Sequence, residues 1–208
     1  MSETGIAGAR RERGGSRPGP RGTPVVRAVR SLLVALAALS PCVALAGAEP
    51  EGSEKEYQLK AAFLFNFAKF VTWPESAFSG RNAPLVIGVV GPDPFGAALE
   101  KTLEGKSIGE RRIEVRRFDD ARDAKKSHIL FIARSNAERL AETIGAIEGA
   151  RVLTVGEDEE FTLRGGIIRF LTLDNRIRFE ANSESARKAG LGLSSQLLKL
   201  AVKPDRDK

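Results

Sequence analysis

Cysteine and histidine are almost absent from this chain of 208 residues, which contains one of each, Cys42 and His128. A structural zinc centre needs about four cysteine or histidine ligands, and a nucleophile–histidine–acid triad can use only His128. A lone histidine at the start of an apolar segment is more often a hydrogen-bonded structural residue than a catalyst. The scarcity argues against an enzyme, and we expect no catalytic residue, no metal site and no cofactor.

Long apolar runs are also scarce, and the longest lies at residues 31–40. A basic stretch precedes this run and Ala44-Leu45-Ala46 follows it, which is the order of a secretory signal peptide. The run is too short for a convincing membrane span. We expect a signal peptide over residues 1–46, cleaved near Ala46 or Ala48, and release into the periplasm. Three alternatives stay open: an uncleaved anchor, a lipoprotein site at Cys42 and a twin-arginine signal at Arg10-Arg11.

Removal of the leader changes the charge of the protein. Of the 33 basic and 27 acidic residues, seven and two respectively precede residue 47, which leaves 26 and 25 and a formal net charge of +1. The basic pI of about 9.7 therefore belongs to the leader. Nucleic-acid binding needs a concentrated basic surface, so we expect no nucleic acid among the partners.

The spacing of apolar residues after the leader predicts an α/β fold. Apolar runs predict strands at residues 85–90, 113–118, 127–132, 152–155, 167–173 and 176–180. Helical spacing predicts helices at residues 54–72, 95–103, 136–147 and 183–202. Because strand and helix alternate, we expect a single three-layer domain with a mostly parallel, mixed sheet and crossover helices, closed by a C-terminal hairpin plus helix. The expected parts are a flexible lead-in at residues 47–54, the domain at 55–203 and a disordered tail at 204–208.

The helix predicted at residues 54–72 is rich in aromatic side chains. It holds four of the eleven Phe and the only Tyr, and the only Trp follows it directly. A helix that is apolar around its circumference must bury more than one face. We expect one face to lie in the core and another to contact a second copy or a partner.

Three polar motifs have a structural as well as a functional interpretation. Residues 91–96 follow a strand and open a helix, but they lack the lysine of a phosphate loop, and two prolines remove backbone donors. Residues 157–160 are acidic but lack the alternating ligands of a calcium loop. Arg176 and Arg178 share one face of a strand and can grip a phosphate or carboxylate. Alternatively, that face is solvated and Arg178 pairs with Glu180.

Seven segments together resemble the YfiR family of periplasmic proteins and follow one another over essentially the whole mature chain. They are residues 57–74 (YQLKAAFLFNFAKFVTWP), 91–96 (GPDPFG), 127–132 (SHILFI), 152–156 (VLTVG), 165–170 (GGIIRF), 176–182 (RIRFEAN) and 189–201 (AGLGLSSQLLKLA). The resemblance implies a small α/β domain that is often a homodimer.

The resemblance also implies that the protein is a repressor. It would bind the periplasmic sensor domain of an inner-membrane diguanylate cyclase, which lowers cyclic-di-GMP and biofilm formation, and an outer-membrane protein can sequester it. We expect the partner interface on apolar residues of the first helix and of the segment that starts at residue 161. These are Phe63, Phe67, Phe70, Phe161, Ile167 and Ile168.

The alternative is a soluble periplasmic module that binds a small anionic ligand. Members of the family have been linked to nucleotides and tryptophan, and Arg176 and Arg178 are the residues here that best match such a site. The chain departs from the family at Ser127, where related sequences often have a cysteine. With no cysteine after residue 42, redox control through a disulfide is not available to the mature protein.

Overall fold

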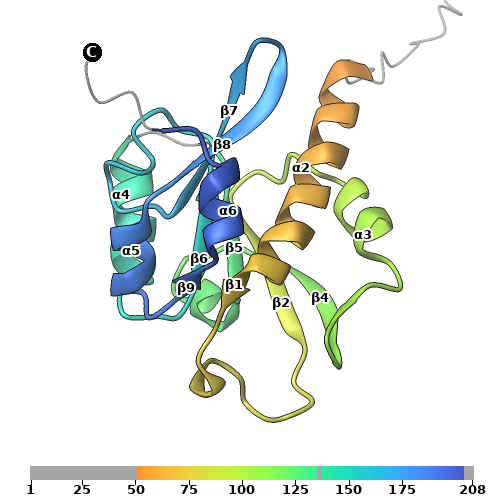
Figure 1. Ribbon diagram of the computed structural model, residues 1–208, viewed down its shortest axis with the longest axis vertical. Coiled ribbons are helices and arrows are strands. Elements are labelled where there is room, and N and C mark those ends of the chain that lie inside the picture. Colours follow the sequence, from red (N-terminus) through yellow and green to blue (C-terminus); the bar gives the residue numbers. More distant parts are fainter. Residues whose placement is uncertain (1–50, 135–136, 204–208) are drawn as a thin grey trace, which may run out of the picture. The chain divides into compact units, whose positions relative to one another are not determined.

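The apolar strands form the centre of a seven-stranded sheet (Figure 1). The computed structural model describes residues 51–134 and 137–203, so the predicted signal peptide and the predicted tail lie outside the described residues. The strands are β2 (Leu85–Val90), β3 (Ser107–Ile108), β4 (Arg111–Phe118), β5 (Ile129–Ile132), β6 (Leu153–Gly156), β7 (Ile168–Leu173) and β8 (Arg176–Ala181). Their order in the sheet is β3-β4-β2-β5-β6-β7-β8.

The middle of this sheet is parallel and its two edges are antiparallel. Strands β4, β2, β5, β6 and β7 pair in parallel, whereas β3 and β8 pair antiparallel with β4 and β7. Asp174 and Asn175 make the turn between β7 and β8 with φ angles of 50° and 55°. Positive φ at both central positions is what a two-residue hairpin of this kind requires. The predicted mixed sheet and C-terminal hairpin are confirmed.

Helices cover both faces of the sheet and make the three predicted layers. Successive residues of β5 alternate between two apolar clusters. Ile129 and Phe131 face the cluster that includes α2 (Glu51–Phe70), and Leu130 and Ile132 face the cluster that includes α4 (Ala137–Ala146). Helix α3 (Ala98–Leu103) lies beside α2, and two 3-10 helices, η2 (Glu75–Ala77) and η3 (Asp123–Lys126), precede β2 and β5.

Helix α2 begins and ends a few residues earlier than the sequence predicted. It starts at Glu51, inside the predicted lead-in, and ends at Phe70. Its buried stripe runs through Ala61, Leu64 and Phe67, at the spacing of one helical face. The next two residues form strand β1 (Val71–Thr72). This strand pairs antiparallel with β9 (Gly192–Leu193) in a separate two-stranded sheet.

The single helix predicted at residues 183–202 is wrong. This segment forms α5 (Ser183–Lys188), strand β9 and α6 (Ser195–Leu200). Gly190 has a φ of 71°, and a residue in that left-handed conformation ends a right-handed helix. Two side chains then cap the separate helices. Asn182 accepts a hydrogen bond from the Ser185 N–H at the start of α5, and Ser194 accepts one from the Leu197 N–H at the start of α6.

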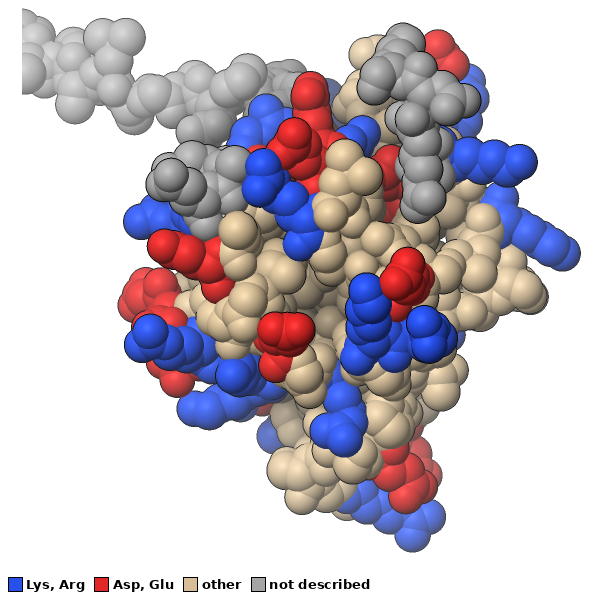
Figure 2. All heavy atoms as spheres, turned by 90° about the vertical axis from the view of Figure 1, so that its left-hand side faces the viewer, with Lys and Arg blue, Asp and Glu red and all other residues tan. Residues whose placement is uncertain are grey.

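The described residues belong to one compact unit. Figure 2 shows its face on the α4 and α5 side, where basic and acidic side chains are interspersed and neither sign forms a continuous patch. Within residues 51–134 and 137–203, no helix has the length and apolar character needed to cross a membrane.

Candidate functional site

The candidate site is a cavity at the carboxyl ends of the parallel strands. Its volume is about 750 Å³, and it is lined by α2, by the loops after β2, β5 and β6, and by β7. Strand β2 lies between β4 and β5 in the sheet. The chain therefore passes from β2 to β4 on one side of β2 and then crosses to β5 on the other side. Ligands of open α/β sheets bind in the crevice that such a change of direction creates. The topology therefore places the cavity where a site is expected.

Lys60 forms the charged floor of this cavity. It belongs to the buried stripe of α2, and the residue is only 5% exposed. Its Nζ lies 2.5 Å from Glu157 Oε1 and also contacts Glu56 Oε1, one turn earlier on α2. An isolated ammonium would be strongly destabilising at such burial. The two carboxylates compensate its charge, and Glu157 joins α2 to the end of β6.

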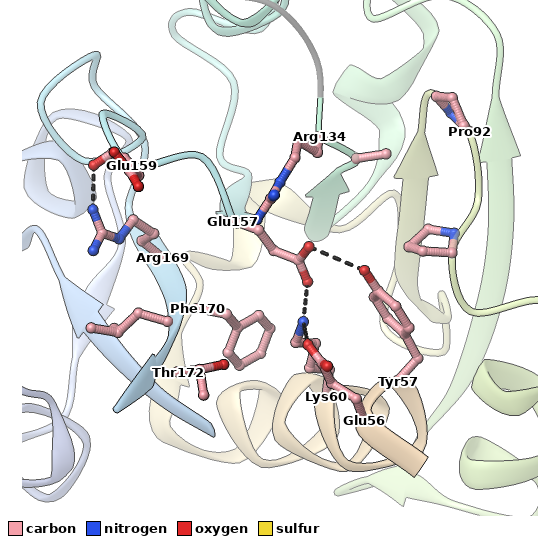
Figure 3. A pocket seen from close by; sticks show the side chains of 13 residues that line it. Glu56, Tyr57, Lys60, Pro92, Arg134, Glu157, Glu159, Arg169, Phe170 and Thr172 are labelled. Atoms are coloured by element: carbon pink, nitrogen blue, oxygen red, sulfur yellow. Dashed lines mark hydrogen bonds and ion pairs between the residues drawn. The ribbon is translucent and has the colours of Figure 1, made fainter. Parts of the chain in front are cut away.

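Glu157 is the centre of the polar network (Figure 3). One of its carboxylate oxygens accepts from Lys60, and the other accepts from the Tyr57 hydroxyl at 3.2 Å. Burial, and then the neighbouring Glu157 carboxylate, raise the pKa of Tyr57 well above its ordinary range. The hydroxyl is therefore protonated at physiological pH and stays a donor. The Tyr57 ring also packs edge-on against Phe95, with 5.3 Å between ring centroids.

The mouth of the cavity combines charges of both signs with apolar side chains. Arg169 donates to the Glu159 carbonyl oxygen, and its Nε lies 3.5 Å from Glu180 Oε1. Arg134 enters from the loop after β5, and Phe170 lines the wall opposite the loop after β2. Such a cavity suits a small molecule that has both a flat apolar part and charged groups.

The loop after β2 is held by an ion-pair network rather than arranged around a phosphate. Arg117 pairs with Asp93 and Glu100 and donates to the Gly96 carbonyl oxygen. Because Arg117 donates to the Glu100 carboxylate, the pKa of Glu100 is lowered from its ordinary value. Asp93 also accepts from the Phe95 N–H at 2.8 Å. The structural interpretation of residues 91–96 as a strand-to-helix turn is confirmed.

Comparison with known proteins identifies the family. A family model described as YfiR/HmsC-like matches residues 57–202. The chain belongs to the YfiR/HmsC-like family. Membership of this family indicates a periplasmic regulatory protein of cyclic-di-GMP signalling.

Solved structures give a more distant comparison. Eight chains match, among them the crystal structure of a conserved domain protein from Vibrio cholerae O1 biovar El Tor strain N16961. The two chains share 13% sequence identity with a TM-score of 0.48, and the match covers 70% of this chain and 59% of that chain. This chain thus spans less than two thirds of that protein. A comparison with curated proteins finds no match.

The two arginines predicted to bind a ligand lie outside the cavity. Arg176 and Arg178 are exposed on β8, and neither lines the space around Lys60. Glu180, expected on the same solvated face, is instead 5% exposed. It accepts from the Thr162 hydroxyl and pairs with Arg169, so the expected pairing with Arg178 is not formed. Ligand binding by the two arginines stays a prediction.

Most of the residues predicted at the partner interface are core residues, and this part of the prediction needs correction. Phe67, Phe161, Ile167 and Ile168 are at most 2% exposed. Burial within the domain accounts for their apolar character, and in this conformation they offer no surface to a partner. Phe63 and Phe70 are half-buried, and their contact with a partner stays a prediction.

Phe161 directly follows the acidic run in the loop after β6 and is fully buried. Its ring fills the space between two glycines, because a Cβ on Gly156 or on Gly166 would lie 2.2 Å from a ring carbon. The ring thus anchors the loop that carries Glu157 and Glu159 on the sheet. The acidic run is not freely solvated along its whole length, because the Glu157 side chain is 8% exposed and pairs with Lys60.

His128 lies at the opposite end of the strands from the cavity. Its Nδ1 accepts from the Val86 N–H at 3.0 Å, so the neutral ring carries its proton on Nε2. The ring stacks on Phe78 with 4.3 Å between centroids. Burial lowers the pKa of His128 below its ordinary value. These contacts agree with the structural role expected from the sequence.

Sequence reasoning missed the group of Tyr57, Lys60 and Glu157. One signal was available, because Lys60 occupies a helical position in register with Leu64 and Phe67 on an otherwise apolar face. A lysine at such a position is either a break in the stripe or a buried cation with a partner. The partner, Glu157, is 97 residues away in the sequence, and no local pattern connects the two.

Proposed function

We propose that this protein represses an inner-membrane diguanylate cyclase by binding the periplasmic sensor domain of the cyclase. The family match carries this proposal, because it extends from within α2 to beyond α6 and so covers nearly all of the described domain. The predicted signal peptide at residues 1–46 would deliver the domain to the periplasm. From there it reaches only the part of the cyclase outside the cytoplasm, so it acts on the conformation of the sensor.

Repression of this kind is a matter of differential affinity. A bound protein shifts its partner between two states only if it binds one of them more tightly. To turn a cyclase that is 99% active into one that is 99% inactive, the repressor must prefer the inactive sensor by about 10⁴-fold. An outer-membrane protein that sequesters the repressor would remove this preference and restore cyclic-di-GMP synthesis.

The outer stripe of α2 is the surface that we propose for this contact. Leu59, Phe63 and Phe70 lie on one face of α2, one and then two helical turns apart, with the exposed Asn66 between the two phenylalanines, and Leu59 is 48% exposed. Phe63 and Phe70 pack against the apolar core from their half-buried positions. A mainly apolar stripe that adjoins the core and is open to solvent resembles the centre of a protein interface. The same stripe is available for the homodimer that the resemblance leads us to expect.

Deletion of the gene tests the proposal in a strain that keeps its cyclases. We expect cyclic-di-GMP and surface attachment to rise, and a plasmid copy of the full chain to restore both. A plasmid copy with Leu59→Asp should fail to restore them, because a carboxylate in the apolar stripe opposes docking. Gln196→Asp, which is exposed on α6, is the matched control and should restore both. Unchanged cyclic-di-GMP and attachment after deletion would refute the proposal.

The cavity favours a second function, the binding of a small ligand. About 750 Å³ lies within the range of small-molecule sites, and Tyr57 and Phe170 offer ring faces beside the buried Lys60. We propose a nucleotide or an aromatic amino acid as the ligand. Titration calorimetry can separate the two candidate places. Heat lost only in Arg134→Ser assigns the ligand to the cavity, and heat lost only in Arg176→Ser/Arg178→Ser assigns it to the predicted arginines. No heat with the wild-type protein would remove this function.

A further inference from the structure

The β7–β8 hairpin carries a surface beside the cavity, around the two arginines that the sequence predicts as a ligand site. Its register pairs Leu171 with Arg178 and Leu173 with Arg176. Paired residues of an antiparallel ladder point to the same side, as do residues two apart on one strand. The four side chains therefore share one face, which we call the hairpin face. Figure 1 shows the hairpin projecting past the rest of the sheet.

The hairpin face is apolar and cationic at once. Leu173 is 49% exposed, although it is a large hydrophobic residue. Arg176 and Arg178 are also exposed, and their side chains have no hydrogen-bond or ion-pair partner among the described residues. The carboxylate closest to them in sequence on this strand, Glu180, is buried and already held by Arg169 and Thr162. Among the residues that the structure describes, two cations without an ionic partner thus stand beside the exposed Leu173.

The backbone beside these side chains is also open. β8 is the edge strand of the sheet. In a two-residue hairpin the pairs Leu173–Arg176 and Leu171–Arg178 exchange hydrogen bonds, so the N–H and C=O of Ile177 point outward. The C-terminal segment covers the edge only farther along, where the Val202 N–H donates to the Phe179 carbonyl oxygen at 2.8 Å. No described residue pairs with the edge at Ile177.

We propose that the hairpin face docks an acidic, extended segment of a protein partner. The arginines bind carboxylates of that segment, its apolar side chains cover Leu171 and Leu173, and its backbone pairs with Ile177 as an added strand. A second copy of this chain is not the occupant, because identical faces would bring like charges together. The inference rests on the proposed function for the identity of the partner, which is the sensor domain of the cyclase.

A charge reversal in the full chain tests the docking directly. The probe is a fluorescent peptide of alternating Glu and Leu, which carries the proposed chemistry without requiring the cyclase. We expect saturable binding to the wild type, at least about tenfold weaker binding to Arg176→Glu/Arg178→Glu, and weaker binding to Leu173→Ser, which keeps the charge. Arg81→Glu/Arg112→Glu reverses two exposed arginines elsewhere and should bind like the wild type. Arg176→Gln/Arg178→Gln, which removes charge without adding repulsion, should fall between.

Three outcomes would overturn the inference. The first is equal peptide binding by the wild type and Arg176→Glu/Arg178→Glu, and the second is an equal loss of binding in Arg81→Glu/Arg112→Glu. The third is binding of the protein to anionic phospholipid vesicles but not to the peptide, because the hairpin face would then be a membrane contact. Complementation of the deletion strain with the charge-reversed variant distinguishes failure of the docking proposal from failure of the proposed function. If deletion raises cyclic-di-GMP but the reversed variant represses like the wild type, the repressor stands and the docking face is wrong. If deletion has no effect while the peptide still discriminates, the proposed function fails and the docking chemistry stands.

Discussion

At the carboxyl ends of the parallel strands the protein keeps a charged cavity, whereas at the amino ends of the same strands it stacks rings on one another. Lys60 and Glu157 meet at the first end. At the second, Phe78 lies between the His128 ring and the Arg111 guanidinium, the latter 3.8 Å from the Phe78 centroid. Arg111 also donates to the carbonyl oxygens of Gly80 and Ala83. The amino end is therefore closed by its own side chains.

The difference teaches where substitutions should change function and where they should change only stability. The amino end is filled by stacked rings and leaves His128 6% exposed. The carboxyl end leaves about 750 Å³ open above the Lys60 ammonium and its two carboxylate partners. Loops at the carboxyl ends of an α/β sheet are the usual place for binding. We therefore expect binding changes from the carboxyl end and mainly stability changes from the amino end.

The largest effect is expected from Lys60→Met at the carboxyl end. This change leaves Glu56 and Glu157 without their cation, and the free energy of unfolding should fall by about 3–5 kcal/mol, as for other broken buried pairs. Lys60→Met/Glu157→Gln should recover a large part of that loss, because it removes both charges. Urea unfolding measures both. Lys101→Met, which is exposed on α3, should stay within about 0.5 kcal/mol. A comparably small loss in Lys60→Met would mean that the pair does not hold the cavity together.

A smaller loss is expected from Gly166→Ala, in the loop that carries the acidic side of the cavity. The new Cβ would lie 2.2 Å from the Phe161 ring and 2.7 Å from its carbonyl oxygen, so the ring must move. Overpacking of this kind costs about 1–3 kcal/mol of unfolding free energy. Gly145→Ala in α4 meets no atom within 4 Å and should stabilise the protein by about 0.5–1 kcal/mol. Equal melting temperatures for the two variants would contradict the tight fit around Phe161.

The smallest effect is a pH dependence at the amino end. Because burial lowers the pKa of folded His128, the unfolded chain binds a proton near pH 6.5 that the folded protein accepts only at lower pH. The free energy of unfolding should therefore fall as the pH drops below about 6.5, by at most about 1.4 kcal/mol per pH unit. His128→Gln should show a shallower fall between pH 7 and pH 5 in urea unfolding. If the free energy of unfolding falls equally with pH in the wild type and in His128→Gln, His128 is not the cause of the pH dependence.

The fold followed from the sequence where local patterns decide the structure. The runs at Leu85–Val90 and Ile129–Ile132 are apolar throughout, as strands covered on both faces must be, and Asp174-Asn175 identified the hairpin. The C-terminal helix failed because helical spacing continues through residues 183–202, whereas Gly190 adopts a left-handed conformation there. Spacing reports which face is apolar, and it does not report where the backbone turns.

The candidate site was harder to predict because its parts are brought together by the sheet. The apolar character of Phe161 and Ile167 predicts an interface, but burial in the core explains it equally well. The alternation of residues along one strand predicts that Arg176 and Arg178 share a face, and both are exposed in the structure. No local pattern predicts the role of Lys60, although a cation on an apolar helical face indicates a distant partner.

The burial of Lys60 has a practical consequence for anyone who labels this protein. An ammonium that is 5% exposed and held by two carboxylates has little access to an amine-directed reagent, whereas Lys55 and Lys69 on the same helix are exposed. Their labelling thus provides an internal reference. Modification of Lys60, read by mass spectrometry, would report the fraction of molecules in which α2 has come away from the end of β6. The extent of Lys60 modification is therefore an intrinsic measure of how often α2 separates from the end of β6.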